Sequence, residues 1–240
     1  MPPPADITLR QRDVDHILHP YSNAQKIAAS GPLIISRGEG VYVYDTEGRH
    51  YLEGMAGSWS TSLGFSEHRL ADAAARQFAK LPYSQIFSER SHEPGILLAE
   101  RLTSSAPEGL NHVLFASSGS ESIDAAAKIV WYYHNQIGKP AKKKLIGRIN
   151  GYHGVTVAGG SLTGQPHIHA DFNLPIAGIL HTDSPTYYHF GKPDESVEQF
   201  VARIADNLEA LIQREGPETI GAFFAEPVMG SGGVIVPPPG

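Results

Sequence analysis

The sequence contains no cysteine among its 240 residues. This absence excludes disulfide bonds, metal sites built from thiolates and a cysteine nucleophile. It does not indicate the compartment, because chains without cysteine occur under both oxidising and reducing conditions.

Long apolar runs are also absent. Nowhere do 18 apolar residues follow one another, and the N-terminal segment MPPPADITLRQRD has no apolar core of the kind that signal peptides carry. We therefore predict a cytoplasmic protein without a membrane segment. The net charge of −6 argues against non-specific binding to nucleic acid or to an anionic membrane surface.

Several common functional motifs do not occur. Both Gly-Lys pairs, Gly138–Lys139 and Gly191–Lys192, are followed by proline, so there is no Walker A motif, and there is no G-x-G-x-x-G. The absence of G-x-S-x-G argues against a serine hydrolase. The sequence has 12 histidines but no H-E-x-x-H, and we expect no metal site at residues 167–171.

Strand and helix patterns alternate along the chain. They predict a hairpin from residues 41–44 and 49–52, strands at 113–115, 145–146, 179–180 and 220–225, and helices at 67–80, 94–105 and 195–214, with a further helix after residue 118. Such alternation implies βαβ units. The predicted fold class is therefore α/β, with a mostly parallel sheet and helices on both faces.

The segment HVLFASSGSESIDAAAK, residues 112–128, places serines and a glycine between a strand and a helix. Ser118 with Glu121 matches a capping box, in which the hydroxyl and the carboxylate each accept a main-chain N–H. Capping does not explain Gly119 and Ser120, whereas a phosphate at the helix N-terminus would use both. Because short Gly/Ser motifs are non-specific, both interpretations stay open on local sequence.

Three further positions are candidates for binding. Tyr152 and His153 lie between glycines just past a strand, where they could flank a flat heterocycle, although for an isolated loop a tyrosine that packs on its own domain is the commoner case. Glu226 ends a buried strand, where open α/β sheets place ligand-binding groups, although it could simply pair with an arginine. Trp59 lies in a glycine-rich loop, and we interpret it as a pocket wall.

Several motifs occur in one order along nearly the whole chain. They are His19–Pro20–Tyr21, Gly40–Val41–Tyr42, Gly54–Met55–Ala56–Gly57–Ser58–Trp59, Ser118–Gly119–Ser120–Glu121, Lys143–Lys144, Gly151–Tyr152–His153–Gly154, Ser161–Leu162–Thr163–Gly164 and Glu226–Pro227–Val228. Together they resemble the class III (subgroup II) aminotransferases, which are pyridoxal-phosphate enzymes of fold type I, and among these the omega-amino-acid:pyruvate transaminases. The order of several motifs makes the resemblance specific.

The resemblance implies roles for the candidate residues. The cofactor phosphate would be held by Ser118, Gly119 and Ser120. Tyr152 would stack on the pyridine ring with His153 beside it. Glu226 would lie near the ring hydroxyl and help to fix the carboxylate that pairs with the ring nitrogen. The substrate pocket would be lined by Tyr21 and Trp59; no metal is implied.

Two departures from the family pattern qualify these roles. The helix continues with Ser122–Ile123–Asp124 where the family usually has Ala–Asn–Asp. Ser58 and Ser60 flank Trp59 where the family commonly has bulkier residues.

The resemblance also implies a domain organisation and an activity. Residues 1–62 would form an N-terminal segment that is part of the small domain, and residues 63–240 an incomplete large domain that binds pyridoxal 5'-phosphate. The intact protein, expected to be a homodimer of chains about twice as long, would transfer an amino group from an amine or omega-amino acid to a 2-oxo acid such as pyruvate. The lysine that holds the cofactor would lie beyond Gly240.

Two alternatives stay open. The chain could be a non-catalytic fragment or pseudoenzyme that binds only phosphate or a partner chain. A pyridoxal-phosphate decarboxylase or aminomutase of the same fold would have the same motifs.

Overall fold

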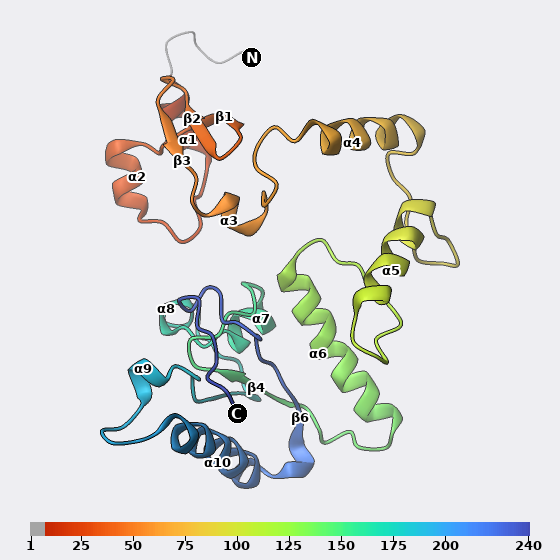
Figure 1. Cartoon of the computed structure of the whole chain (residues 1–240), viewed down its shortest axis with the longest axis vertical. Helices are drawn as coiled ribbons and strands as arrows, with labels where there is room; N and C mark the ends of the chain where they lie inside the picture. The colour runs from red at the N-terminus through yellow and green to blue at the C-terminus, as the bar shows by residue number, and fades with distance from the viewer. Residues whose placement is uncertain (1–7) are drawn as a thin grey trace. The chain divides into compact units, whose positions relative to one another are not determined.

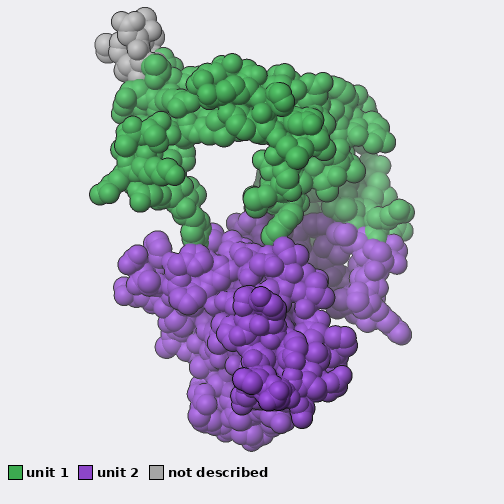
Figure 2. All heavy atoms as spheres, turned by 60° about the vertical axis from the view of Figure 1, so that its left-hand side comes forward, with its two compact units in different colours: residues 1–101 green, residues 102–240 purple. Residues whose placement is uncertain are grey.

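The structure is a computed structural model that describes residues 8–240. The chain divides after Arg101 into two compact units (Figure 2). Each unit is described by itself. The predicted domain boundary between residues 62 and 63 stays a prediction.

The first unit contains a small antiparallel sheet in the order β1-β2-β3 (Figure 1). Its elements are α1 (Leu9–His16), α2 (Ala24–Ser30), β1 (Ile35–Glu39), β2 (Tyr42–Asp45), β3 (His50–Leu52), α3 (Ala56–Trp59), α4 (His68–Lys80) and most of α5 (Glu93–Ser105). The predicted hairpin is confirmed, since β2 pairs with β3, with Val43 opposite Tyr51. The predicted helices at 67–80 and 94–105 are confirmed as α4 and α5.

A buried carboxylate closes the turn of this hairpin. Asp45 Oδ1 accepts the main-chain N–H groups of Glu47 and Arg49, each at 2.9 Å. Its Oδ2 accepts Arg49 Nε at 2.7 Å and the Tyr51 hydroxyl at 2.9 Å. The turn is thus fixed by one side chain that bonds to both of its ends.

The second unit contains a parallel sheet in the order β5-β4-β6. Its elements are α6 (Gly119–Gln136), β4 (Lys144–Arg148), α7 (Val157–Leu162), α8 (Pro166–His169), β5 (Ile179–Thr182), α9 (Tyr187–Phe190), α10 (Val197–Glu215), the 3-10 turn η1 (Pro217–Thr219) and β6 (Ile220–Phe223). The predicted strands at 145–146 and 179–180 and the helix at 195–214 are confirmed as β4, β5 and α10.

Helices cover both faces of this sheet, as predicted. Neighbouring residues of a strand point to opposite faces, and in β4 Leu145 packs with Ala127 of α6 while Ile146 packs with Leu211 of α10. Figure 1 shows α6 and α10 on opposite sides of β4. Because the strands are parallel, the segments that follow β4 and β6 leave the sheet at one edge.

Two predicted strands need correction. Residues 113–115 form no strand, and Leu114 and Phe115 are exposed. The apolar run alone does not make a strand, because a strand requires a neighbour to share its hydrogen bonds, and these residues pair with no strand of residues 8–240. β6 ends at Phe223, two residues before the predicted end.

Candidate functional site

The candidate site begins at the N-terminus of α6. Ser118 is the N-cap, with extended φ and ψ of −152° and 162°, and its Oγ accepts the Glu121 N–H at 3.1 Å, as the capping interpretation predicts. The other half of the predicted box is wrong: Glu121 Oε2 accepts the N–H of Ser117, at 2.8 Å, rather than that of Ser118. The carboxylate reaches one residue further back and holds the chain that enters the helix.

The first turn of α6 has the donors that a phosphate requires. The N–H groups of Gly119 and Ser120 make no hydrogen bond within residues 8–240. A methyl group on Gly119 would meet nothing within 4 Å, so an anion can approach the main chain there. Free N–H groups at the start of an 18-residue helix attract anions. These residues therefore fit a phosphate group.

Ser120 joins this turn to the segment that follows β4. Its Oγ accepts the Val155 N–H at 3.0 Å, so the hydroxyl oxygen is fixed while its proton remains available to another acceptor. Gly154, at φ +114°, makes the close approach possible, since a methyl group there would lie 2.5 Å from Ser120 Oγ. The candidate phosphate site and the loop around Tyr152 thus form one assembly.

Glu226 reaches the same loop from the end of β6. Its Oε1 accepts the Tyr152 N–H at 2.8 Å, and its Oε2 accepts the Gly230 N–H at 3.1 Å. Arg148 is the arginine near Glu226: its Nη1 donates to the main-chain carbonyl of Glu226, at 3.2 Å, and the Glu226 charge opposes the lowering of the Arg148 pKa by burial. The carboxylate instead holds two main-chain N–H groups.

His153, the next residue of this loop, is buried, with only 7% of its surface exposed. Its N–H donates to Thr163 Oγ1 at 2.8 Å, and its ring makes an edge-to-face contact with Phe224. Burial lowers the pKa of His153, a change that the nearby Glu226 carboxylate partly opposes. In the described part of the chain, the buried Nε2 atom of this ring has no hydrogen-bond partner. A buried polar atom of this kind favours a ligand with a complementary polar group.

Two residues to which the sequence analysis assigned no role contribute to the site. Thr163 is fully buried, and its Oγ1, which accepts the His153 N–H, lies 3.0 Å from Gly159 O. Asp124 binds Thr156 and Gly159 of the same segment. Asp124 could have been found from its position one turn after Ser120, which places the two side chains on one face of the helix.

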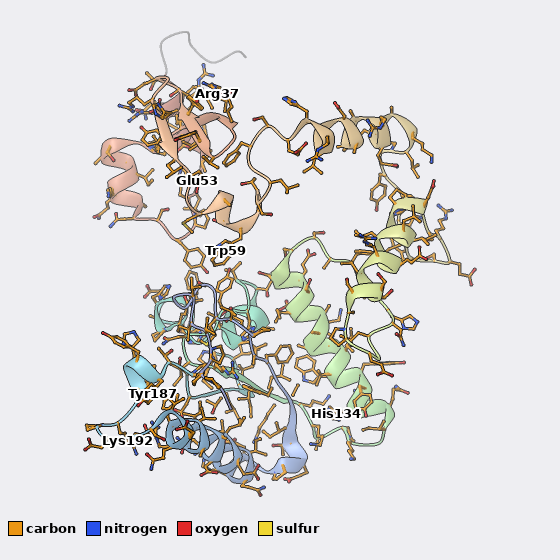
Figure 3. The ribbon with its side chains drawn as sticks, in the orientation of Figure 1. Arg37, Glu53, Trp59, His134, Tyr187 and Lys192 are labelled. Carbon is orange, nitrogen blue, oxygen red and sulfur yellow. The ribbon has the colours of Figure 1, made fainter. Side chains whose placement is uncertain are left out.

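Tyr21 and Trp59 belong to the first unit. Trp59 ends α3, a turn in which Ala56 to Trp59 all have positive φ, and its side chain is 64% exposed (Figure 3). Tyr21 also has positive φ, +50°, and is exposed. Their predicted place in a substrate pocket stays a prediction.

Two lysines of the second unit bond to main-chain carbonyls or to a carboxylate. Lys142 Nζ donates to the carbonyls of Pro217 and Ile220, and Lys144 Nζ pairs with Glu215 at 3.0 Å. Lys128 is exposed on α6. Among residues 8–240 no three His, Asp or Glu side chains gather as a metal site would need. None of the helices described is both long and apolar enough to cross a membrane.

The chain is similar to aminotransferases in sequence and in structure. Residues 24–240 match the family described as aminotransferase class-III. The chain is 49% identical over 238 residues to a probable gamma-aminobutyrate transaminase 4 of Oryza sativa subsp. japonica, covering 98% of this chain and 49% of that protein. A gamma-aminobutyrate transaminase 1 of the same rice, described as mitochondrial, is 48% identical, over 92% of this chain and 43% of its own length.

Solved structures give the same result. An omega transaminase of Pseudomonas jessenii in complex with PMP superposes with a TM-score of 0.95 at 53% identity, over 97% of this chain and 51% of its own. A PMP-bound aminotransferase of Vibrio fluvialis gives 0.93 at 39% identity, over 96% and 51%. The chain thus spans about half the length of the relatives that it matches.

Proposed function

The chain belongs to the class-III aminotransferase family and has the α/β fold of these enzymes, fold type I, and on this basis we propose that it forms the phosphate- and ring-binding part of a pyridoxal-phosphate-dependent aminotransferase. The observation that carries the proposal is the bond from Val155 N–H to Ser120 Oγ. It joins a helix N-terminus suited to phosphate to the loop that presents Tyr152.

We propose one role for each part of this assembly. Ser118, Gly119 and Ser120 bind the phosphate, and Tyr152 covers one face of the pyridine ring. Glu226 orients Tyr152 by accepting the main-chain N–H of that tyrosine. His153 offers its Nε2 atom to a polar group of the cofactor. When bound, pyridoxal phosphate supplies an electron sink for the substrate carbon that loses its proton.

The proposed reaction transfers an amino group from an amine or omega-amino acid to a 2-oxo acid. Its support is the similarity to gamma-aminobutyrate and omega transaminases. Tyr21 and Trp59 are proposed to line the substrate pocket, and the whole protein is proposed to be a homodimer. A cytoplasmic location stays a prediction, since several relatives are described as mitochondrial.

Titration of the chain with pyridoxal 5'-phosphate tests the proposal. We expect binding that requires the phosphate, so that pyridoxal without phosphate binds far more weakly. Ser120→Ala removes a charge-assisted hydrogen bond and is expected to weaken binding about tenfold or more. Ser122→Ala is the matched control, because the Ser122 hydroxyl bonds to the Ser118 carbonyl and leaves the donors untouched.

Reduction with borohydride then separates the remaining alternatives. Stoichiometric labelling of one lysine, together with amine-to-pyruvate turnover, would place a cofactor lysine within these 240 residues and contradict our expectation that it lies outside them. Equal affinity for pyridoxal with and without phosphate would refute the phosphate site. Phosphate-dependent binding without turnover is what the non-catalytic fragment predicts.

A further inference from the structure

Asp124 lies on α6 one turn beyond Ser120, and both side chains bind the segment of residues 152–159. Asp124 Oδ1 accepts the Thr156 hydroxyl at 2.7 Å and the Gly159 N–H at 3.1 Å. Ser120 Oγ accepts the Val155 N–H at 3.0 Å. Residues four apart on a helix lie on one face, so this face of α6 holds the segment at three points.

The segment lies directly against the helix. A methyl group on Gly154 would lie 2.8 Å from Ser120 Cα of α6. Within the segment itself, a methyl group on Gly159 would lie 2.7 Å from His153 O and 2.9 Å from Thr156 Oγ1, so the segment is also folded closely on itself. Thr156 is also the N-cap of α7, and its Oγ1 accepts the Gly159 N–H at 3.3 Å. Asp124, a residue of α6, therefore accepts hydrogen bonds from two donors at the start of α7 and so links the two helices.

This arrangement links two parts of the candidate site. The N–H groups of Gly119 and Ser120 are at the start of α6, whereas Tyr152 is on the segment that Asp124 holds. Since a carboxylate bonds to N–H and O–H donors more strongly than a neutral acceptor does, Asp124 contributes strongly to the contact between α6 and this segment.

We infer that Asp124 is a positioning residue that fixes the distance between the phosphate site and the aromatic ring of Tyr152. The inference rests on the proposed function. It concerns a residue that would touch neither the phosphate nor the ring. Replacing Asp124 should therefore change the affinity for ligands that contact the phosphate site and the Tyr152 ring together, because only such ligands depend on the distance between the two.

Two measurements on the 240-residue chain test this inference. The first is hydrogen exchange at the amides of Val155 and Gly159 without any ligand, which we expect Asp124→Ala to accelerate about tenfold. The second compares affinity for pyridoxamine 5'-phosphate, which uses both sites, with affinity for inorganic phosphate, which uses only the first. Asp124→Ala should weaken the former about tenfold and the latter less than about threefold, since about one charge-assisted hydrogen bond of coupling is lost.

Control variants separate positioning from general destabilisation. Asp124→Asn keeps an acceptor oxygen and should restore most of the affinity. Asp206→Ala removes an exposed carboxylate of α10 and should change neither measurement. If Asp124→Ala fails to fold, Thr156→Val probes the same bond from the other side.

The outcomes are distinct. Unchanged exchange at Val155 and Gly159, or an equal loss of affinity for both ligands, would overturn the inference. If the unaltered chain fails to bind pyridoxamine 5'-phosphate, the proposed function fails, while the exchange rates still decide whether Asp124 holds the segment.

Discussion

The Glu226 carboxylate accepts the main-chain N–H of Tyr152 at 2.8 Å, across 74 positions of sequence. The two residues follow the neighbouring parallel strands β6 and β4, which end at the same edge of the sheet. The bond orients the loop after β4 relative to the end of β6.

Removing the Glu226 carboxylate should destabilise the second unit. Glu226→Ala leaves the N–H groups of Tyr152 and Gly230 without their acceptors, and we expect the free energy of unfolding to fall by about 1.5–3 kcal/mol. Urea denaturation measures the change. Glu209→Ala on the exposed face of α10 is the matched control, expected to stay within about 0.5 kcal/mol. A Glu226→Ala variant as stable as this control would contradict the role given to the carboxylate.

Gly154→Ala should separate the loop from α6. The added methyl group would lie 2.5 Å from Ser120 Oγ at a φ of +114°, so the variant combines backbone strain with a clash. We expect a loss of about 3 kcal/mol in unfolding free energy and a weaker affinity for inorganic phosphate. Gly178→Ala has a φ of +88° in open space and isolates the strain, with an expected loss of about 1 kcal/mol. Equal losses in the two variants would show that loop and helix are not in contact.

Asp45 should make the first unit sensitive to acid. Burial alone would raise its pKa, but the hydrogen bonds from Arg49, Tyr51 and two main-chain N–H groups outweigh that effect and hold the pKa at about 2, below the usual 3.8. A lowered carboxyl pKa stabilises the folded state above the unfolded-state pKa, and this stabilisation is lost as pH falls from about 4 to about 2. The difference in unfolding midpoint between the unaltered chain and Asp45→Asn, followed over that range, should shrink towards zero. A difference independent of pH would contradict the pKa assigned to Asp45.

Sequence patterns predicted two kinds of structure: helices with a long apolar face, and caps formed by residues close together in sequence. The helix at 195–214 is one example, because its apolar residues recur at helical spacing and Gly216–Pro217 ends it. The N-cap role of Ser118 is another, since a hydroxyl and an N–H three residues later suffice. β1 was not predicted, because its pairing with β2 gives no alternating pattern along Ile35–Glu39, where all residues but Gly38 are exposed.

The contacts that hold the parts of the candidate site together could not be predicted from local sequence patterns. Asp124 and Gly159 are 35 residues apart, and His153 and Thr163 are 10 residues apart at the two ends of the segment that contains α7. Nothing in the sequence near Asp124 indicates which main-chain donor it meets. Residues 113–115 illustrate the opposite error, in which an apolar run has strand composition but no neighbour within the described residues to pair with.

The hydrogen bond from Val155 to Ser120 bears on which ionic form of a phosphate the proposed site at the start of α6 would favour. With one lone pair of its oxygen engaged by the Val155 N–H, the Ser120 hydroxyl keeps its proton to donate to the ligand, as the adjoining N–H groups do. A binding site in which N–H and O–H donors predominate offers little to an acidic hydrogen on the ligand. A phosphate ester loses its second proton near pH 6, so a phosphate bound at the first turn of α6, as proposed, is expected to be held more tightly as the dianion than as the monoanion.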